Sequence, residues 1–474
     1  SGSGDASMFE LDRNSDVPLV DQIVERIAAL IESGQLVEGT WIPSIRKLAR
    51  LTGTSPFTVT ESYDRLVARG LIEARTGRGF YVVRRPAFAA LARIEAVPDP
   101  GTDAVALVRQ AMSGARSLIP AGSGFLPPGW LMESVSTSVL SRLSQARRPQ
   151  AWAPCPPQGL PELLEQLAAR LVQRGIPAGT ANLLTTSGAS QAFDLIARAL
   201  LAPGDAVLVE DPGYFVLFAQ LRAHHARLVP VPRTAEGLDI EMLEELCRAH
   251  RPRAFFVQTL LHNPTGSRLP APQCHRILSL AEQHGFAIVE DDVYGDLCEG
   301  PAVRLAQMDG LRNVIHVGSF SKLIGPTIRV GFVAGEAQLI AQLTERKLLS
   351  TLSGSSLLES IVATVLESGR YQKHLVDVRA RLARARREAR RALESVGVEF
   401  DDANGAGLFL WGRIGHGIDV DALVRQARSE SILLARGSLF SAAERASGYL
   451  RFNAAYSSAP GLLDFLRRTL PQSG

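Results

Sequence analysis

The sequence predicts an α/β protein with two parts. The first is a small N-terminal winged helix-turn-helix. The second is a large domain with a mainly parallel sheet wrapped by helices and a smaller α+β subdomain at its C-terminal end. Two observations predict this division: a short basic stretch has the pattern of three helices and a hairpin, and the longer remainder alternates apolar strands with amphipathic helices. A length of 474 residues corresponds to about three domains.

The composition excludes several classes of protein. Hydrophobic residues make up 46% and charged residues 21% of the chain, which is ordinary for a globular protein. Apolar runs are short and broken by Arg, Gly or Pro, so we expect no membrane span and no membrane partner. The four cysteines lie 92, 27 and 24 residues apart and form neither a CxxC pair nor a disulfide framework. We therefore expect a cytoplasmic protein without a metal site.

The N-terminal stretch predicts three helices followed by a β-hairpin. Apolar residues spaced three and four apart mark each helix, and glycines follow their ends. The third helix has Ser55 as N-cap and Pro56 at its first position, a polar outer face, and an apolar stripe that includes Val67. The expected helices cover residues 18–33, about 43–52 and 56–69, and the expected strands cover 71–75 and 79–83.

The charge of this stretch changes sign along the chain. Residues 10–38 contain seven acidic and two basic residues, whereas residues 42–85 contain nine basic and three acidic residues. Such a block indicates an anionic partner, although a solvated basic face or a small helical cap gives the same pattern. In a helix-turn-helix the second helix enters the major groove, and a hairpin adds a wing. The residues expected at DNA are Arg46, Ser55, Thr58, Thr60, Gly77 and Arg78.

The order of these elements resembles the GntR family of winged-helix regulators over about residues 18–84. The similar segments are PSIRKLA and TSPFTVTESYDRLVARGLIEARTGRGFYVV. The resemblance implies that the chain binds double-stranded operator DNA. The family usually has an Arg directly after the Ser of its recognition helix, whereas this chain has Pro56, so one expected cation is missing from the interface.

The rest of the chain predicts a linker and an α/β domain. Residues 85–120 include Pro86, Pro98 and Pro100 and show little periodicity, apart from a helical pattern around Ala104–Met112. The predicted domains are thus residues 8–84, a linker over 85–120, and residues 121–474. Long helices are expected from about 339 to 396. The other expected strands are Ala206–Glu210, Ala254–Gln258, Phe286–Glu290, Val314–Gly318 and Val330–Ala334, and the helices between them include Ala189–Leu201, Ile240–Arg248 and Gln273–His284.

Lysine is rare in this chain. Only four of the 51 basic residues are Lys, and the others are Arg. A retained Lys suggests chemistry that needs a primary amine able to lose its proton, which is imine formation with an aldehyde. Lys322 lies just past the end of an apolar strand, where α/β sheets form ligand sites, whereas Lys347 and Lys373 lie in helical, charged stretches. The alternative for Lys322 is a surface or capping lysine.

Polar residues at other strand ends complete a pattern around Lys322. The first is a helix start that can bind an anion, Ser187-Gly188-Ala189-Ser190. It is followed along the chain by the aromatic Tyr214, a turn at Asn263, Asp291-x-x-Tyr294, Ser319-x-Ser321-Lys322 and Arg329. Each motif alone is weak, because NP and TG pairs are common in turns. Their order over residues 120–474 resembles the fold-type I aminotransferases, which bind pyridoxal 5′-phosphate (PLP).

The resemblance implies a role for each residue of the pattern. Lys322 would hold PLP as an internal aldimine, and Asp291 would pair with the pyridine nitrogen. Asn263 and Tyr294 would hold the ring oxygen, and Tyr214 would stack on the ring. Arg451, in Leu450-Arg451-Phe452, would grip a substrate carboxylate, although an ordinary surface Arg is the alternative. The phosphate contacts would come from Ala189, Ser190, Ser319, Ser321 and Arg329.

The two resemblances together point to the MocR subfamily of GntR regulators, the GabR-like proteins. This resemblance implies a head-to-tail homodimer and an effector that is PLP itself or a small amino compound. The fold-type I aminotransferases commonly have a Tyr before a Gly-x-Pro-x-Gly-like stretch that reaches the partner subunit's phosphate, whereas residues 152–159 contain no Tyr. A catalytically active aminotransferase with a residual DNA module, and a PLP sensor without an amine ligand, remain alternatives.

Overall fold

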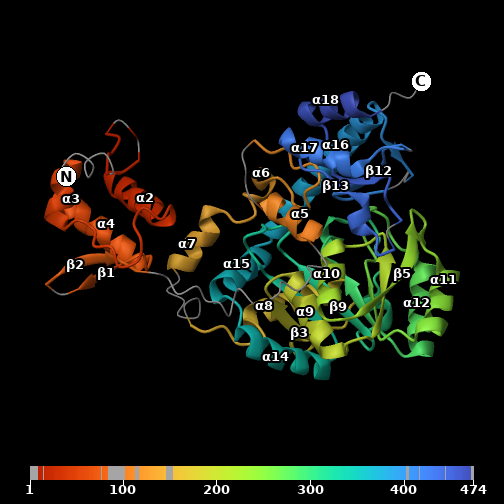
Figure 1. Cartoon of the computed structure of the whole chain (residues 1–474). Coiled ribbons are helices and arrows are strands. Elements are labelled where there is room, and N and C mark those ends of the chain that lie inside the picture. Colours follow the sequence, from red (N-terminus) through yellow and green to blue (C-terminus); the bar gives the residue numbers. More distant parts are fainter. Residues whose placement is uncertain are drawn as a thin grey trace. The chain divides into compact units, whose positions relative to one another are not determined.

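The computed structural model describes residues 9–13, 15, 17–75, 77–83, 102–112, 117–145, 153–401, 405–415, 417–443 and 445–470. The chain divides into two compact units, residues 1–98 and 99–474 (Figure 1). We describe each unit by itself.

The N-terminal unit has the predicted order of three helices and a hairpin. Ser44 caps the second helix by accepting a hydrogen bond from the Lys47 N–H, and Ser55 caps the third by accepting from the Thr58 N–H. Gly53 ends the second helix with a φ of 63°, a conformation that glycine adopts without a steric penalty. The elements are α2 (Leu19–Glu32), α3 (Ile45–Thr52), α4 (Pro56–Ala68), and an antiparallel pair, β1 (Ile72–Arg75) and β2 (Gly79–Val82).

The core of this unit corrects one sequence prediction. Val59, Tyr63 and Leu66 of α4 are fully buried, as their spacing predicts. Val67, which the sequence places on the same stripe, is 39% exposed, because it lies one position past Leu66 on the outer side of the helix. Phe57 is 77% exposed, so the outer face of α4 is not uniformly polar.

The larger unit contains an eight-stranded sheet with the order β3-β10-β9-β8-β7-β4-β5-β6. The five strands from β9 to β5 are parallel, whereas β10 runs antiparallel to both of its neighbours and β6 pairs antiparallel with β5. The predicted strands correspond to β4 (Ala206–Asp211), β7 (Ala254–Val257), β8 (Ala287–Asp291), β9 (Val314–Ser319) and β10 (Gly331–Ala334). Three strands were not predicted from the sequence: β3 (Leu183–Thr186), β5 (Arg227–Thr234) and β6 (Gly237–Leu238).

Helices cover both faces of this sheet. Neighbouring residues of β4 belong to different cores: Val207 and Val209 pack on one side, and Ala206 and Leu208 on the other. Strands buried on both faces read as continuous apolar runs, which is why their sequences show no alternation. The helices around the sheet are α8 (Pro161–Gln173), α9 (Ala189–Leu200), α10 (Phe215–Ala223), α11 (Ile240–His250), α12 (Ala271–His284), α13 (Leu305–Asp309), α14 (Ala337–Thr351) and α15 (Ser356–Glu367).

The C-terminal subdomain is the predicted α+β portion. The long helix α16 (Arg370–Glu394) leads into a four-stranded sheet of the order β11-β12-β14-β13, whose strand pairs are antiparallel. None of the helices in the described ranges is long and apolar enough to cross a bilayer. The remaining elements are β11 (Glu399–Phe400), β12 (Phe409–Arg413), α17 (Val420–Ser429), β13 (Ala435–Arg436), β14 (Tyr449–Asn453) and α18 (Pro460–Thr469).

A helix within the predicted linker belongs to the larger unit. Helix α5 (Thr102–Met112) lies beside α10 (Figure 1). Its Ala104 and Leu107 share a core with Phe215 of α10 and Phe440. Two short helices follow α5, α6 (Pro128–Leu131) and α7 (Thr137–Gln145).

Lys347 lies in a helix, as the sequence predicts, but its side chain is buried. It lies in α14 but is only 1% exposed, and its Nζ donates to Thr185 Oγ1 at 3.3 Å. The Glu359 carboxylate, from the next helix, accepts from the same Thr185 hydroxyl at 2.7 Å and supplies the compensating charge. A buried cation needs such a partner, and this one comes from a different helix.

Candidate functional site

A cavity of about 290 Å³ lies at the carboxyl ends of the parallel strands in the larger unit. Strands β4, β7, β8 and β9 all end at this edge, where α/β sheets commonly place ligand sites. Every site residue that the sequence predicts for this domain lines the cavity: Ala189, Ser190, Tyr214, Asn263, Asp291, Tyr294, Ser319, Ser321, Lys322, Arg329 and Arg451.

The Lys322 amine is held near the cavity without a direct ion pair among the described residues. Its Nζ donates to the Gly124 carbonyl at 3.0 Å and lies 4.3 Å from the centre of the Phe125 ring. Burial, followed by the charges of Arg451 and Arg329, lowers the pKa of this amine to about 7. A large fraction of Lys322 is therefore neutral at physiological pH, and the neutral amine is the form that attacks an aldehyde.

Asp291 is a buried carboxylate at the end of β8. Its Oδ1 accepts from the Val293 N–H at 3.1 Å and its Oδ2 from Gln258 Nε2 at 2.9 Å. Burial raises the pKa of this carboxyl to about 7. A cationic ring nitrogen beside Asp291 would favour its charged form, so the site is suited to a protonated pyridine.

The start of α9 forms an anion cradle with Arg329. No side chain of the described residues caps this helix, so the N–H groups of its first turn remain available to a ligand. Arg329 donates to the Ser187 carbonyl at 2.9 Å and to Ser321 Oγ at 3.3 Å, which holds the guanidinium beside the helix start. A Cβ on Gly188 would lie 2.6 Å from the Arg329 Nη2, and Gly188 has a φ of 81°, so this close approach requires glycine.

Arg451 is a buried guanidinium on β14. It donates to Asn263 Oδ1 at 3.0 Å and to the Gly122 carbonyl at 2.7 Å, and its charge lies 4.4 Å from the centre of the Phe409 ring. Its Nε is buried and has no hydrogen-bond partner in the described part of the chain. Burial lowers the pKa of Arg451 to about 10, which leaves it charged at neutral pH. A buried cation with an unused donor is suited to a carboxylate ligand.

Two tyrosines stand at the other walls of the cavity. Tyr214 precedes the first residue of α10, and burial raises the pKa of its phenol to about 12. Tyr294 is buried with its ring edge-on to Phe409 at 5.4 Å, and burial raises its pKa as well. Both phenols therefore stay protonated and can donate hydrogen bonds.

This donor set fits PLP. It contains an amine with a lowered pKa, a buried carboxylate, an uncapped helix start beside an arginine, and protonated phenols. These groups match the aldehyde, the ring nitrogen, the phosphate and the ring oxygen of the cofactor, in that order.

The structure adds residues that the sequence patterns did not identify. Gln258 joins two predicted residues, because its Nε2 donates to Asp291 and its Oε1 accepts from the Asn263 N–H at 2.7 Å. Its position directly after β7 was the available signal. Helix α5 contributes an apolar wall, for which the helical spacing of its apolar residues was the only signal: Leu107, Val108, Ala111 and Met112.

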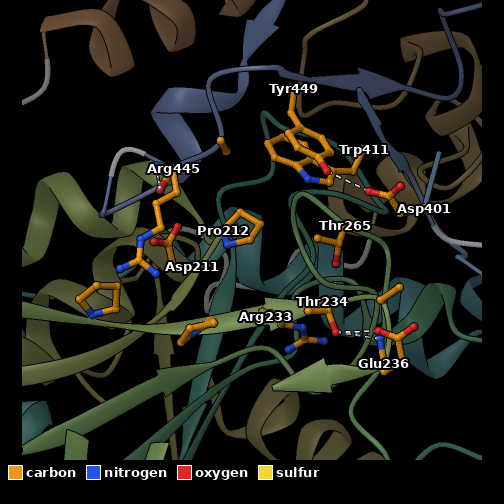
Figure 2. A pocket seen from close by; sticks show the side chains of 15 residues that line it. Asp211, Pro212, Arg233, Thr234, Glu236, Thr265, Asp401, Trp411, Arg445 and Tyr449 are labelled. Atoms are coloured by element: carbon orange, nitrogen blue, oxygen red, sulfur yellow. Dashed lines mark hydrogen bonds between the residues drawn. The ribbon is translucent and has the colours of Figure 1, made fainter. Parts of the chain in front are cut away.

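A second cavity of about 310 Å³ lies between the large sheet and the C-terminal subdomain (Figure 2). Trp411 and Tyr449 stack at its edge with ring centres 5.1 Å apart, and Tyr449 donates to Asp401 at 2.9 Å. The Asp211 carboxylate at its other side accepts from the Ala443 N–H at 3.2 Å. None of the predicted site residues lines this cavity, and its carboxylates already accept hydrogen bonds from protein groups.

The predicted DNA-contacting residues all lie in the N-terminal unit. Arg46 is exposed on α3, and Gly77 and Arg78 are exposed in the β1–β2 turn. At the start of α4, the Ser55 and Thr58 hydroxyls are 2.9 Å apart, and the Thr60 hydroxyl donates to the Pro56 carbonyl at 2.9 Å. Trp152, at the start of the stretch that lacks the expected Tyr, lies outside the described residues.

Two family models match the chain. Residues 123–468 match "Aminotransferase class I and II", and residues 19–82 match "Bacterial regulatory proteins, gntR family". These segments correspond to the larger unit and to the winged helix.

Curated relatives are similar over nearly the whole chain. The HTH-type transcriptional regulator YdcR of Escherichia coli K12 is 30% identical over 453 residues, which cover 92% of this chain and 94% of YdcR. The probable rhizopine catabolism regulatory protein MocR of Rhizobium meliloti is 29% identical over 441 residues. The aligned residues cover 90% of this chain and 87% of MocR.

Solved aminotransferases have a similar fold. One is LysN, an α-aminoadipate aminotransferase from Thermus thermophilus complexed with N-(5′-phosphopyridoxyl)-L-leucine. It matches with a TM-score of 0.70 and 26% sequence identity, and the match covers 80% of this chain and 95% of the LysN chain. Kynurenine aminotransferase of Pyrococcus horikoshii matches with a TM-score of 0.72 and 24% sequence identity. The match covers 80% of this chain and 94% of the aminotransferase chain.

Proposed function

The chain belongs to the MocR/GabR-like regulators, which join a GntR-type winged helix to an aminotransferase class I and II domain, and we accordingly propose that it is a PLP-dependent transcriptional regulator. It binds operator DNA through the N-terminal unit and senses an amino compound in the cavity around Lys322. The observation that carries this proposal is the meeting of all the predicted cofactor residues around one cavity in a chain that also contains a winged helix.

Each residue of the cavity has a proposed task. PLP supplies an aldehyde that exchanges reversibly between one amine and another. Lys322 binds the cofactor covalently because its amine is largely neutral at physiological pH. Asp291 holds the ring nitrogen, and Asn263 and Tyr294 orient the ring oxygen. The first turn of α9 and Arg329 hold the phosphate, with support from the nearby serine hydroxyls.

The lining of the cavity suggests the class of effector. Arg451 is the group that binds a carboxylate, with its unused Nε available to an incoming acid. The four cavity-lining side chains of α5 are all apolar, so this wall favours an uncharged, apolar substituent. We propose an amino acid with an apolar side chain as the preferred effector, in place of a free amine or a dicarboxylic acid.

The position of α5 in the sequence provides a route from the cavity to the DNA-binding unit. The helix begins 20 residues after the last residue of β2 and ends in the cavity wall. An effector that packs against α5 acts on the segment that connects the two units. In a head-to-tail homodimer, a shift of this segment would change the spacing of the two winged helices and the half-sites that they span.

The test uses the full-length protein, Lys322→Ala, and Lys373→Ala as a control at an exposed lysine. Borohydride treatment followed by peptide mapping should label Lys322 in PLP-saturated wild type and in the control. Absorbance titrations with a panel of amino acids and amines should show a spectral change that is largest for apolar amino acids.

Operator binding measured in the same titrations tests the regulatory part. Effectors should alter the affinity or footprint of wild type and of Lys373→Ala, but not of Lys322→Ala. Identical footprints for all proteins, with and without effector, would rule out the switch. Sustained conversion of PLP to pyridoxamine phosphate by amino acids, with reversal by keto acids and no effect on DNA binding, would favour the aminotransferase alternative.

A further inference from the structure

The start of α4 presents an aromatic ring to solvent. Phe57 is the second residue of this 13-residue helix and is 77% exposed. It is the most exposed large apolar side chain in the described part of the N-terminal unit, ahead of Val37 at 60% and Val17 at 49%. An aromatic ring at such exposure buries little apolar area in the fold, so most of its surface is available to a partner.

The ionic contacts of α4 show which end of the helix is available to an anion. Near its C-terminal end, Arg65 pairs with Asp21 of α2 at 2.6 Å, and Arg69 pairs with Glu25 of α2 at 2.8 Å. Both cations are therefore occupied by carboxylates of the neighbouring helix. The first turn contains no acidic residue, so the positive end of the helix dipole is not neutralised there.

The helix that precedes this first turn is basic on its exposed side. Arg46, Lys47 and Arg50 are exposed on the preceding helix α3. Residues 42–85 contain nine basic and three acidic residues. This charge complements a polyanion, and DNA is the polyanion that the GntR-family match indicates.

The chemistry of the first turn selects the part of the DNA that Phe57 can contact. A phenyl ring cannot donate to a phosphate, and Pro56 has no N–H to offer. The hydroxyls of Ser55, Thr58 and Thr60 already bond within the helix start. The contact left to Phe57 in the major groove is apolar, and the 5-methyl group of thymine is the apolar group that a base pair presents there.

We infer that Phe57 is a specificity-determining residue that packs against a thymine methyl group in each operator half-site. This inference rests on the proposed binding of operator DNA. Pro56 itself stands where the resemblance leads one to expect an arginine, and the inference assigns an apolar contact to the residue that follows it.

The first step of the test identifies a binding sequence. The full-length protein selects duplexes from a randomised library, and the selected site is then synthesised with each dT replaced in turn by dU, which removes only the 5-methyl group. We expect one position in each half-site at which dU weakens binding about fourfold, the affinity equivalent of one buried methyl group.

The second step compares variants on the dT and dU duplexes. Phe57→Ala should bind both duplexes equally at that position, because the contact is already lost. Val67→Ala removes an exposed apolar side chain from the other end of α4 and should keep the discrimination of wild type. Circular dichroism should be unchanged in both variants, since both side chains are exposed.

The outcomes separate this inference from the function on which it rests. If wild type binds a selected duplex but no dU substitution weakens binding, the thymine contact is wrong while DNA binding stands. If Phe57→Ala keeps full discrimination, another residue reads the methyl group. If Phe57→Ala instead disrupts association with another protein and leaves DNA binding unchanged, the ring is a protein contact. If no duplex is selected, DNA binding and the thymine contact both fail.

Discussion

Replacement of Lys322 by Met should stabilise the cofactor-free protein. Met is similar in length and removes only the ammonium group. The pKa of Lys322 falls from 10.5 to about 7 in the folded protein, mainly because of burial. At about 1.4 kcal/mol per pKa unit, this difference corresponds to roughly 4–5 kcal/mol of unfavourable free energy at neutral pH.

Two effects reduce the expected gain. Lys322 is only half-buried by surface area, so water in the cavity screens part of the cost. The variant also leaves the Gly124 carbonyl without its 3.0 Å hydrogen bond, which costs about 1–3 kcal/mol. We expect a net stabilisation of about 2 kcal/mol at pH 7 for Lys322→Met, from the balance of these magnitudes.

The dependence on pH identifies the cause. The folded-state pKa of Lys322 lies below the unfolded value, so the cost is fully present below pH 7 and disappears as the pH rises toward 10.5. The advantage of Lys322→Met over wild type should shrink over this range. Denaturant unfolding of the cofactor-free proteins measures it, with Lys373→Met as the control at an exposed position.

A single result would refute this reasoning. If Lys322→Met is no more stable than wild type at pH 7, while Lys373→Met is unchanged within about 0.5 kcal/mol, burial does not penalise the ammonium form. Lys322 would then be an ordinary ammonium group in the folded protein rather than a reactive neutral amine.

Three further predictions concern the cofactor, the effector and the winged helix. The rate at which PLP attaches to Lys322 should rise with pH through about 7 and then level off, as followed by stopped-flow absorbance; a rise that continues toward 10.5 would indicate an ordinary lysine. Arg451→Lys should weaken amino-acid binding at least about tenfold, through loss of bidentate contacts, and change the affinity of amines without a carboxylate little, as measured by spectral titration. Tyr63→Phe removes a 2.6 Å hydrogen bond to the Pro43 carbonyl and should lower the free energy of unfolding of the N-terminal unit by about 1 kcal/mol, as measured by denaturant unfolding. An unchanged free energy of unfolding would show that this bond does not stabilise the unit.

Local signals in the sequence were sufficient for much of the fold. Ser44 and Ser55 predict helix starts because a side-chain oxygen accepts from an N–H three residues later, and both caps are present. The five predicted strands of the large sheet are also present, because short apolar runs of this length, rich in β-branched and aromatic residues, favour a buried strand over a helix. Strand β5 was missed because Pro230 and Pro232 interrupt its pattern, although its pairing with β4 tolerates them.

The candidate site shows where local signals end. Lys322, Asp291 and Arg451 were identifiable as residues, because their chemical types and their order along the chain point to one cofactor. Their surroundings were not, because the Gly124 carbonyl and the side chain of Gln258 reach them from distant segments.

The sequence by itself determined which residues line the cavity and which elements they follow, since strand ends and helix caps depend on neighbours only a few positions away. The tertiary structure alone decided three environments: the buried partner of Lys347, the apolar wall that α5 adds to the cavity, and the exposure of Phe57. Burial and electrostatic environment depend on contacts between residues far apart in the chain, and no local pattern encodes those contacts.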